Sequence, residues 1–210
     1  MARNLEAKCK KCRRIGEKLF LKGERCTSPK CAMVKRNFPP GFHGPKGKKR
    51  LSDYGQQLYE KQKIKRQYNL LEKQFKLTFE AAKKHSGNVG ENFLKLLETR
   101  LDNVIFRLGF AASRAEARQM VGHGIFTLND KMVNIPSIQV RTGDVIKIKA
   151  NKKNNKNLKN IQEEIKKKEI PGWLNLDTKN DLIGKVLHAP DIKELSRSVN
   201  IHVVVEFYSR

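Results

Sequence analysis

Four cysteines have the spacing of a metal site. Cys9 and Cys12 form one close pair, and after thirteen residues Cys26 and Cys31 form a second pair. Two pairs of thiols joined by a loop suit the tetrahedral coordination of Zn²⁺, and four thiolates leave no open position for water. The pattern therefore predicts a structural zinc ion. An iron–sulfur cluster or unligated reduced thiols are the alternatives.

Two arginines one helical turn apart form the second candidate site. Arg114 and Arg118 fall on one face of a helix expected over residues 113–121. Together with His123 and Lys131 in the turns that follow, these guanidinium groups would suit a phosphate backbone. An ordinary solvated basic helix face is the alternative.

Two expected helices and a small sheet would position these arginines. Apolar residues recur at helical spacing over Asn92–Leu108, and Ser113 and Glu116 match a capping box at the start of the next helix. After Gly122-His123-Gly124 the pattern changes to short strands, with a turn at Asn129-Asp130. The expected strands are 125–128, 132–134, 145–149, 174–176 and 182–187.

Composition indicates a polyanionic partner. The 210 residues include 45 Lys and Arg against 21 Asp and Glu, a net charge of +24 that exceeds what solubility requires. No apolar run reaches transmembrane length, and no signal peptide or lipidation motif is present, which argues against a membrane partner. The cytosol is the expected compartment, and cysteines there are more often metal ligands than disulfides.

The first fifty residues are basic and poor in large apolar side chains. They hold 16 Lys and Arg against 3 acids, so metal binding is expected to fold the cysteine segment. The strap 37–45 carries Phe38, Phe42 and His43, which are expected to pack on RNA sugars or bases. A linker with a charged tail is the alternative reading.

Outside this module, the chain is expected to be helical from Leu51 to about Lys84 and irregular after Lys149. Ser52 caps the first of two helices, and Lys61, Lys63, Lys65 and Arg66 form a charge run that either contacts phosphates or is a solvated face. The Lys- and Asn-rich stretch 151–168 is expected to be mobile. Trp173 reads as a core residue, and Ile201–Phe207 is a final β-branched run.

Several motifs resemble known RNA-binding proteins. Ser113–Arg118, with Gly122-His123-Gly124 and Val133-Asn134, resembles a small RNA-binding module shared by a ribosomal protein, pseudouridine synthases, some tyrosyl-tRNA synthetases and a ribosome-binding heat-shock protein. Over nearly the whole chain, further motifs resemble the family of the fourth protein of the bacterial small ribosomal subunit. These motifs are Ala2-Arg3, Cys12-Arg13-Arg14, Pro39–Gly44, Leu51–Gly55, Glu60–Lys63, Leu97–Val104 and Val205–Arg210.

The resemblance implies an α+β fold in which a small α/β RNA-binding domain, two short helices on an antiparallel sheet, is inserted into a helical domain with a zinc-stapled N-terminal arm. The implied domains are the basic arm 1–45, the helical domain 46–90 completed by about 189–210, and the insert 91–188. Residues 151–168 depart most from the family, and nothing is carried over to them.

The resemblance also implies a function. The family contains primary binders of a helical junction in the five-prime domain of small-subunit rRNA, which act early in assembly and then lie near the channel by which mRNA enters. They touch the fifth protein of that subunit and influence decoding accuracy. No membrane or small-molecule substrate is implied. The implied zinc ligands are Cys9, Cys12, Cys26 and Cys31, and the expected RNA-binding residues are Arg3, Arg13, Arg14, Arg36, Lys48, Lys49, Arg50, Lys63, Arg66, Arg114, Arg118, His123 and Lys131.

Two other functions compete with this one. Arg100-Leu101-Asp102 matches a tripeptide around the catalytic aspartate of some pseudouridine synthases, but the rest of the chain is too short for a synthase domain. The second competing function is that of a free ribosome-rescue factor with the same module, but such proteins lack the long cysteine arm. Neither enzyme activity nor rescue is therefore expected.

Overall fold

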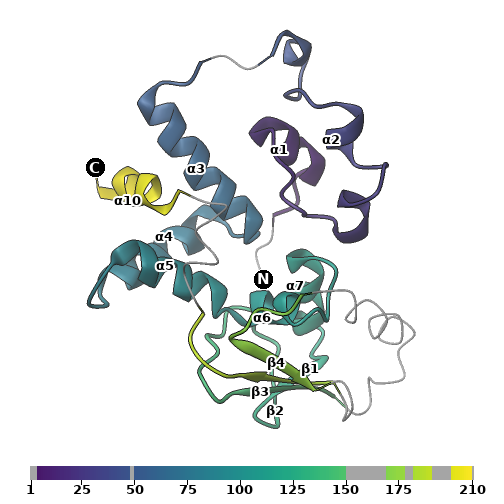
Figure 1. Cartoon of the computed structure of the whole chain (residues 1–210), viewed down its shortest axis with the longest axis vertical. Helices are drawn as coiled ribbons and strands as arrows, with labels where there is room; N and C mark the ends of the chain where they lie inside the picture. Colours follow the sequence, from purple (N-terminus) through teal and green to yellow (C-terminus); the bar gives the residue numbers. More distant parts are fainter. Residues whose placement is uncertain (1–3, 48–49, 150–168, 178–181, 191–199, 210) are drawn as a thin grey trace. The chain divides into compact units, whose positions relative to one another are not determined.

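The computed structural model describes residues 4–47, 50–149, 169–177, 182–190 and 200–209 (Figure 1). The predicted mobile stretch 151–168 lies outside them. The chain divides into two compact units, the first formed by residues 1–94 and 192–210 and the second by residues 95–191. In the described part of the chain, no helix is long and apolar enough to cross a membrane.

The cysteine segment of the first unit contains two short helices and two 3₁₀ turns. Helix α1 spans Lys8–Ile15 and α2 spans Ala32–Lys35, with turns at Gly23–Cys26 and Gly44–Lys46. A small cluster of buried side chains holds this segment together. Its members are Cys12, Ile15, Leu19, Cys31 and Met33, with Leu21 and Tyr59 packed against them. Because two of these five side chains are thiols, the apolar core is as small as the sequence predicts.

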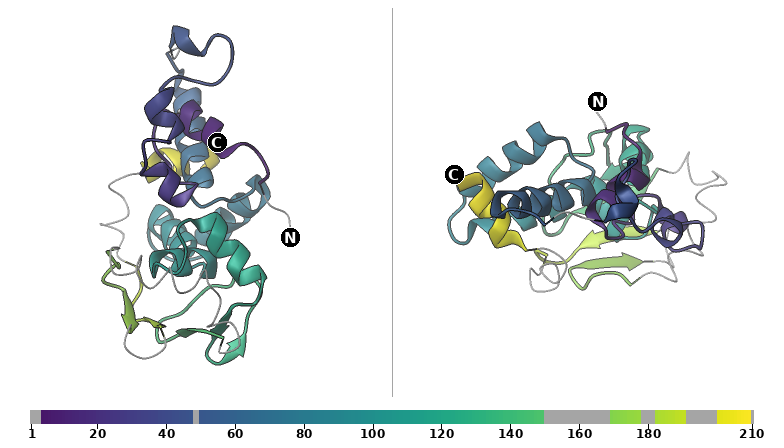
Figure 2. Two further views of the ribbon diagram at one scale, coloured as in Figure 1. Left: turned by 90° about the vertical axis from the view of Figure 1, so that its right-hand side faces the viewer. Right: turned by 90° about the horizontal axis from the view of Figure 1, so that it is seen from above.

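Three longer helices lie wholly within the first unit: α3 (Asp53–Gln67), α4 (Glu72–Lys83) and α10 (Ile201–Ser209). The predicted cap is confirmed, because Ser52 Oγ accepts from the Gly55 amide at 3.3 Å. The predicted division into two helices is also confirmed, and Asn69 makes the turn between them with a φ of 54°. Helix α10 lies beside α3, as Figures 1 and 2 show.

The β-branched run at 201–207 is helical despite its composition. Ile201 and Val204 are buried, and the ring of Tyr208 stacks on Phe79 with centroids 4.7 Å apart. Burial of this face against the first unit therefore outweighs the strand preference of β-branched residues.

The single helix predicted over 92–108 is wrong. The structure has two helices, α5 (Val89–Glu98) and α6 (Leu101–Arg107), because Arg100 is extended, with ψ at 135°. The backbone around this break pairs with a distant loop instead: the Leu101 amide donates to Ile138 O at 2.8 Å, and the Val140 amide donates to Thr99 O at 2.8 Å. These tertiary hydrogen bonds replace helical ones, so apolar periodicity alone could not reveal the break.

The second unit places α6 and α7 (Arg114–Gly122) on one face of an antiparallel sheet (Figures 1 and 2). The strands are β1 (Phe126–Leu128), β2 (Lys131–Met132), β3 (Val145–Ile148), β4 (Leu174–Asp177) and β5 (Ile183–Val186), in the order β2-β1-β3-β5-β4. The prediction that the last two strands extend the module's sheet is confirmed. So is the core position of Trp173, which is 2% exposed.

The turn between β1 and β2 also follows the prediction. Asn129 and Asp130 have φ values of 49° and 64°, the left-handed pair of a tight hairpin turn. Asn129 Nδ2 donates to Asp144 Oδ1 at 2.8 Å, which ties this hairpin to the approach of β3.

Candidate nucleic-acid interface

Helix α7 begins with the predicted side-chain cap, in a slightly different form. Ser113 Oγ accepts from the Glu116 amide at 3.3 Å, as predicted. The Glu116 carboxylate accepts from the amide of Ala112 at 2.9 Å, one residue further back than in a standard capping box. The two contacts fix the start of the helix that carries Arg114 and Arg118.

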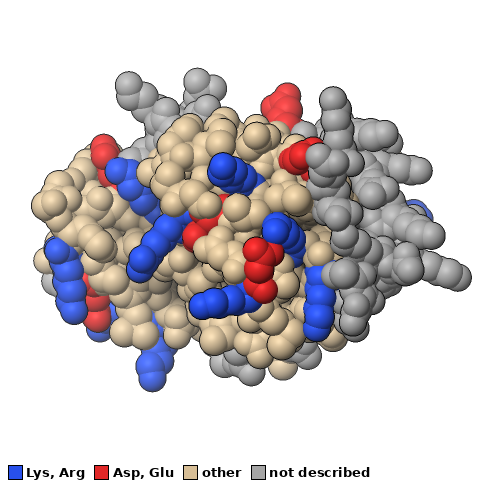
Figure 3. Space-filling model, turned by 90° about the horizontal axis from the view of Figure 1, so that it is seen from below, with Lys and Arg blue, Asp and Glu red and all other residues tan. Residues whose placement is uncertain are grey.

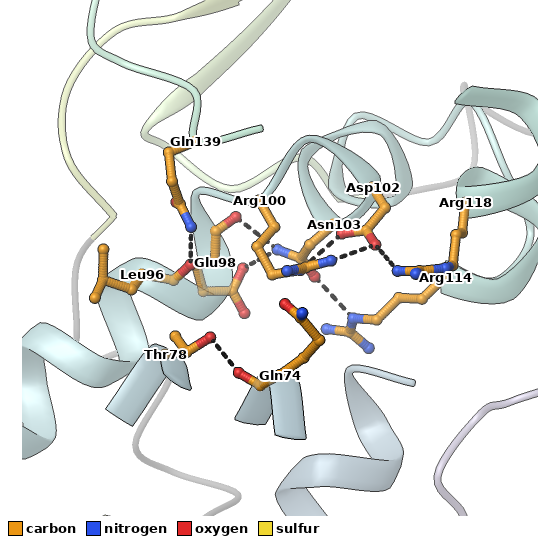
Figure 4. Close-up of polar contacts among 10 residues, drawn as sticks. All are labelled: Gln74, Thr78, Leu96, Glu98, Arg100, Asp102, Asn103, Arg114, Arg118 and Gln139. Atoms are coloured by element: carbon orange, nitrogen blue, oxygen red, sulfur yellow. Dashed lines mark hydrogen bonds and ion pairs between the residues drawn. The ribbon is translucent and has the colours of Figure 1, made fainter. Parts of the chain in front are cut away.

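Arg118 shares a carboxylate with a second arginine. Arg118 Nη1 donates to Asp102 Oδ2 at 3.2 Å. Arg100 donates to both oxygens of the same carboxylate, from Nε at 3.1 Å and Nη2 at 3.0 Å. Asp102 is therefore paired, and two arginines share its carboxylate (Figure 4).

Arg114 is held by a neutral partner. Its Nε donates to Asn103 Oδ1 at 2.7 Å, and its guanidinium lies over the ring of Phe106, 4.6 Å from the centroid. Asn103 is oriented in turn by Glu98, because its Nδ2 donates to Glu98 Oε2 at 2.7 Å. Figure 4 shows Asn103 between Glu98 and Arg114.

The two arginines of α7 therefore share a face, as the spacing predicts, but this face is not an ordinary solvated one. The polar residues that hold them come from the end of α5 and the start of α6. His123 and Lys131 are exposed, and within the described residues neither side chain forms a hydrogen bond or an ion pair. Sequence reasoning missed Arg100, Asn103 and Glu98 as parts of this site. The available signal was that Glu98 and Arg100 are charged residues within the predicted amphipathic helix.

The charge run on α3 differs from the prediction. Lys61 and Lys65 donate to opposite oxygens of Glu72, each at 2.7 Å, and Lys63 pairs with Glu17 at 2.7 Å. Lys61 and Lys63 are buried, so the solvated-face alternative is wrong at these two positions. Helix packing aligns them with acids from other segments, which sequence spacing within one helix cannot show.

Arg66 differs from these lysines in its surroundings. It is half-buried, and among the described residues its side chain forms no hydrogen bond or ion pair. Burial lowers the pKa of Arg66, and the positive charge of Arg14 adds to this effect. Burial likewise lowers the pKa of Lys11, which lies near Arg66 and Lys65 with Glu6 as its acid partner at 3.3 Å. Positive charge therefore accumulates where α1 packs on α3.

Arg13 organises the strap rather than pointing away from the protein. Its Nε donates to Phe38 O at 2.9 Å and its Nη2 to Pro39 O at 3.2 Å, while its guanidinium lies 4.9 Å from the centre of the Phe38 ring. Phe42, by contrast, is 94% exposed, and the ring of His43 meets it edge-on. Of the predicted aromatic contacts, Phe42 and His43 are thus exposed, whereas Phe38 is partly buried.

The other predicted RNA-binding residues divide into two groups. Arg14, Arg36 and Arg50 are exposed, whereas Arg3, Lys48 and Lys49 lie outside the described residues. Figure 3 shows Lys and Arg side chains spread over one face of the molecule, separated by uncharged surface and a few acids. On this face the basic side chains are distributed rather than gathered into a single patch.

The four cysteines are neighbours in the first unit. Cys12, Cys26 and Cys31 are buried and Cys9 is partly buried, and all four are free thiols. Burial raises the pKa of the Cys12 thiol, and the other three thiols add to the rise. The Lys22 amide donates to Cys26 Sγ at 3.3 Å, a contact that stabilises a thiolate.

The donor set therefore fits a thiophilic metal, since a bound cation would hold these neighbouring thiols deprotonated. In the part of the chain that the structure describes, no three Cys, His, Asp or Glu side chains are grouped to hold a metal ion. Zinc stays a prediction.

Comparison with known proteins matches both parts of the chain. The Ribosomal protein S4/S9 N-terminal domain model matches residues 3–98, and the S4 domain model matches residues 99–146. The chain is 52% identical to small ribosomal subunit protein uS4 of Heliobacterium modesticaldum and 50% identical to the proteins of that name in Ruminiclostridium cellulolyticum and Nitrosospira multiformis. Each match covers 210 residues and the whole of both chains.

Proposed function

Given that the chain belongs to the uS4 family of small ribosomal subunit proteins, we propose that it is a primary binder of small-subunit rRNA, which recognises a helical junction in the five-prime domain and nucleates assembly there. As a member of this family, it is a structural RNA-binding component of the cytoplasmic small subunit. Its named relatives are ribosomal proteins rather than enzymes.

The observation that supports junction binding most is the distribution of positive charge. The net charge of +24 is spread over both units, on exposed residues such as Arg14, Arg36, Arg50 and Lys131. RNA junctions are recognised by shape and backbone contacts, which need a broad basic surface more than side chains that read bases. Exposed Phe42 adds an aromatic surface for a sugar or an unstacked base.

The finer parts of the proposal rest on the family resemblance. We propose that the assembled protein lies beside the channel by which mRNA enters and touches the fifth small-subunit protein, and that this contact influences translational accuracy. Neighbouring small-subunit proteins and mRNA are thus proposed partners beside rRNA.

Zinc is the proposed structural cofactor. Cys9, Cys12, Cys26 and Cys31 would hold it, and the metal would cross-link a segment whose apolar core is small. Ordering this arm before it meets RNA would reduce the entropy lost on binding.

Sedimentation of ribosomal subunits tests the proposed location. A tagged chain expressed in cells should migrate with small subunits and stay bound through a high-salt wash. Migration with free large subunits but not small ones would favour the rescue factor and contradict the proposal. Uridine isomerisation by the purified protein, abolished by Asp102→Ala, would instead revive the enzyme reading.

A further inference from the structure

One buried carboxylate in the second unit serves two arginines. The side chain of Asp102 is 6% exposed and that of Arg100 is 4% exposed, whereas the side chain of Arg118 is 19% exposed. Arg100 binds both carboxylate oxygens as a fork, and Arg118 donates to one of them. Arg118 is therefore the member of this group that reaches the surface.

The charges of this group do not balance. Two guanidinium groups share one carboxylate, and the two-pronged bond from Arg100 already matches that carboxylate's charge. Arg118 is consequently fixed in orientation but not neutralised. A guanidinium carries five N–H donors in a planar fork, so the single bond to Asp102 leaves donors for an anion that arrives from solvent.

Arg114, one turn earlier on α7, is held in a comparable way. Asn103 accepts from its Nε, and the ring of Phe106 supports its flat face. Neither of these two contacts involves a charged group, so each orients the guanidinium and neither cancels its charge. Asn103 is itself fixed by bonds to the carbonyl and carboxylate of Glu98, whose side chain is fully buried. Figure 4 shows both arginines meeting the polar residues of α6 from the same helix.

We propose that Asp102 and Asn103 are positioning residues for RNA binding: they hold the guanidinium groups of Arg118 and Arg114 in the orientation that receives phosphates of the rRNA backbone. The inference rests on the proposed function and assigns a role to two residues that themselves carry no positive charge. Pre-orienting a long side chain matters because its rotamer freedom is otherwise lost when RNA binds.

Replacing Asp102 tests this proposal well, because a repulsive role and a positioning role predict opposite changes in RNA affinity. If Asp102 only adds negative charge near RNA, Asp102→Asn should strengthen binding by removing repulsion. If Asp102 orients Arg118, the same variant should bind a five-prime-domain rRNA transcript about tenfold more weakly. Asp130→Asn is the matched control, because it removes an exposed acid from the same unit, and its affinity should equal or exceed that of the parent chain.

A second pair of variants decides the matter if Asp102→Asn does not fold. Arg118→Lys and Arg114→Lys keep the charge but lose the planar fork, so each should weaken binding several-fold. In a folded Asp102→Asn chain, Arg118→Lys should add little further loss, since both changes remove one interaction. Parent-like affinity of both lysine variants would overturn the proposal.

The outcomes also separate this proposal from the proposed function. A parent chain that does not prefer the five-prime-domain transcript over an unrelated structured RNA would contradict the proposed function. A parent chain that does prefer it, with lysine variants of equal affinity, would contradict the positioning role alone.

Discussion

Arg13 joins two parts of the first unit that are far apart in the sequence. Its guanidinium donates to the carbonyls of Phe38 and Pro39 and lies against the Phe38 ring, so it links α1 to the strap that presents Phe42. A residue expected to contact phosphate therefore also supports the segment proposed to meet RNA.

Arg13→Lys tests this structural role. Lysine keeps the positive charge but lacks the fork that reaches both carbonyls. We expect faster amide hydrogen exchange over residues 38–46, equivalent to a loss of about 1–3 kcal/mol in local stability. Arg14→Lys is the control, because Arg14 is exposed and donates to no carbonyl among the described residues. Equal exchange in the two variants would contradict the role of Arg13.

Glu72 connects three helices of the first unit. Its carboxylate, at the start of α4, accepts from Lys61 and Lys65 of α3 and from the hydroxyl of Tyr208 of α10. Burial opposes ionisation of this carboxyl, but the three hydrogen bonds outweigh that effect and lower the pKa of Glu72 to about 2.

The lowered pKa predicts how stability changes with pH. A carboxyl whose pKa is lower in the folded state stabilises the fold above its unfolded pKa of about 4.3, and this contribution is lost as pH falls towards 2. Urea unfolding should therefore show Glu72→Gln less stable than the parent at pH 7, with the difference shrinking below about pH 4.3. A difference that stays constant down to pH 2.5 would refute the assignment. Glu80→Gln, an exposed acid on α4, should resemble the parent throughout.

The sequence predicted which residues form the site more readily than it predicted their hydrogen-bond partners. Helical spacing placed Arg114 and Arg118 on one face, and this is confirmed. The hydrogen bonds from Arg114 to Asn103 and from Arg118 to Asp102 depend on how α6 packs on α7, which local sequence does not encode. The same limit explains Lys63, whose acid partner Glu17 is 46 residues away in the sequence.

At the scale of elements, the cysteine segment is where metal should matter most. Its helices are short, and its core is a cluster of five buried side chains, so a cross-link would contribute much of its order. The apparent binding free energy of a structural zinc is about 10 kcal/mol or more in small domains.

Cys9→Ser combined with Cys12→Ser should release the metal. Metal analysis should find about one zinc per parent chain and none in the variant, and amide exchange should increase over residues 8–35. Trp173, the one tryptophan, is buried in the second unit, so its fluorescence should stay unchanged. Full zinc content in the double variant would contradict the ligand assignment.

The sheet of the second unit depends on a close approach between β5 and the end of α6. A Cβ atom added to Gly184 would lie 2.5 Å from Cδ1 of Leu108, which is fully buried. Gly184→Ala should therefore lower the free energy of unfolding by about 1–3 kcal/mol, through overpacking. Urea unfolding followed by Trp173 fluorescence measures this change. Gly172→Ala, where an added Cβ meets nothing within 4 Å, should change it by less than about 0.5 kcal/mol.

Most elements followed from the sequence, and the exceptions have tertiary causes. Capping and turn residues predicted the starts of α3 and α7 and the hairpin turn at Asn129-Asp130. The break between α5 and α6 depends on hydrogen bonds to residues 136–140, and the helical state of 201–209 depends on burial. Neither cause leaves a signal in local periodicity.

At the scale of the whole molecule, RNA binding is expected to involve many weak contacts in both units. Each phosphate contact by Lys or Arg releases counterions, so affinity should fall steeply as salt increases. Replacing both Arg114 and Arg118 with alanine should reduce the slope of log affinity against log salt by about one to two. An unchanged slope would mean that these arginines do not meet phosphates.

Binding to an in vitro transcript of the rRNA five-prime domain tests whether this protein recognises the rRNA junction. The comparison RNA is an unrelated structured RNA of equal length, and both are titrated across a salt series. A primary junction binder should prefer the five-prime domain by about a thousandfold at physiological salt. Equal affinity for the two RNAs, lost together as salt rises, would contradict junction recognition and leave only a general attraction of a basic protein for RNA.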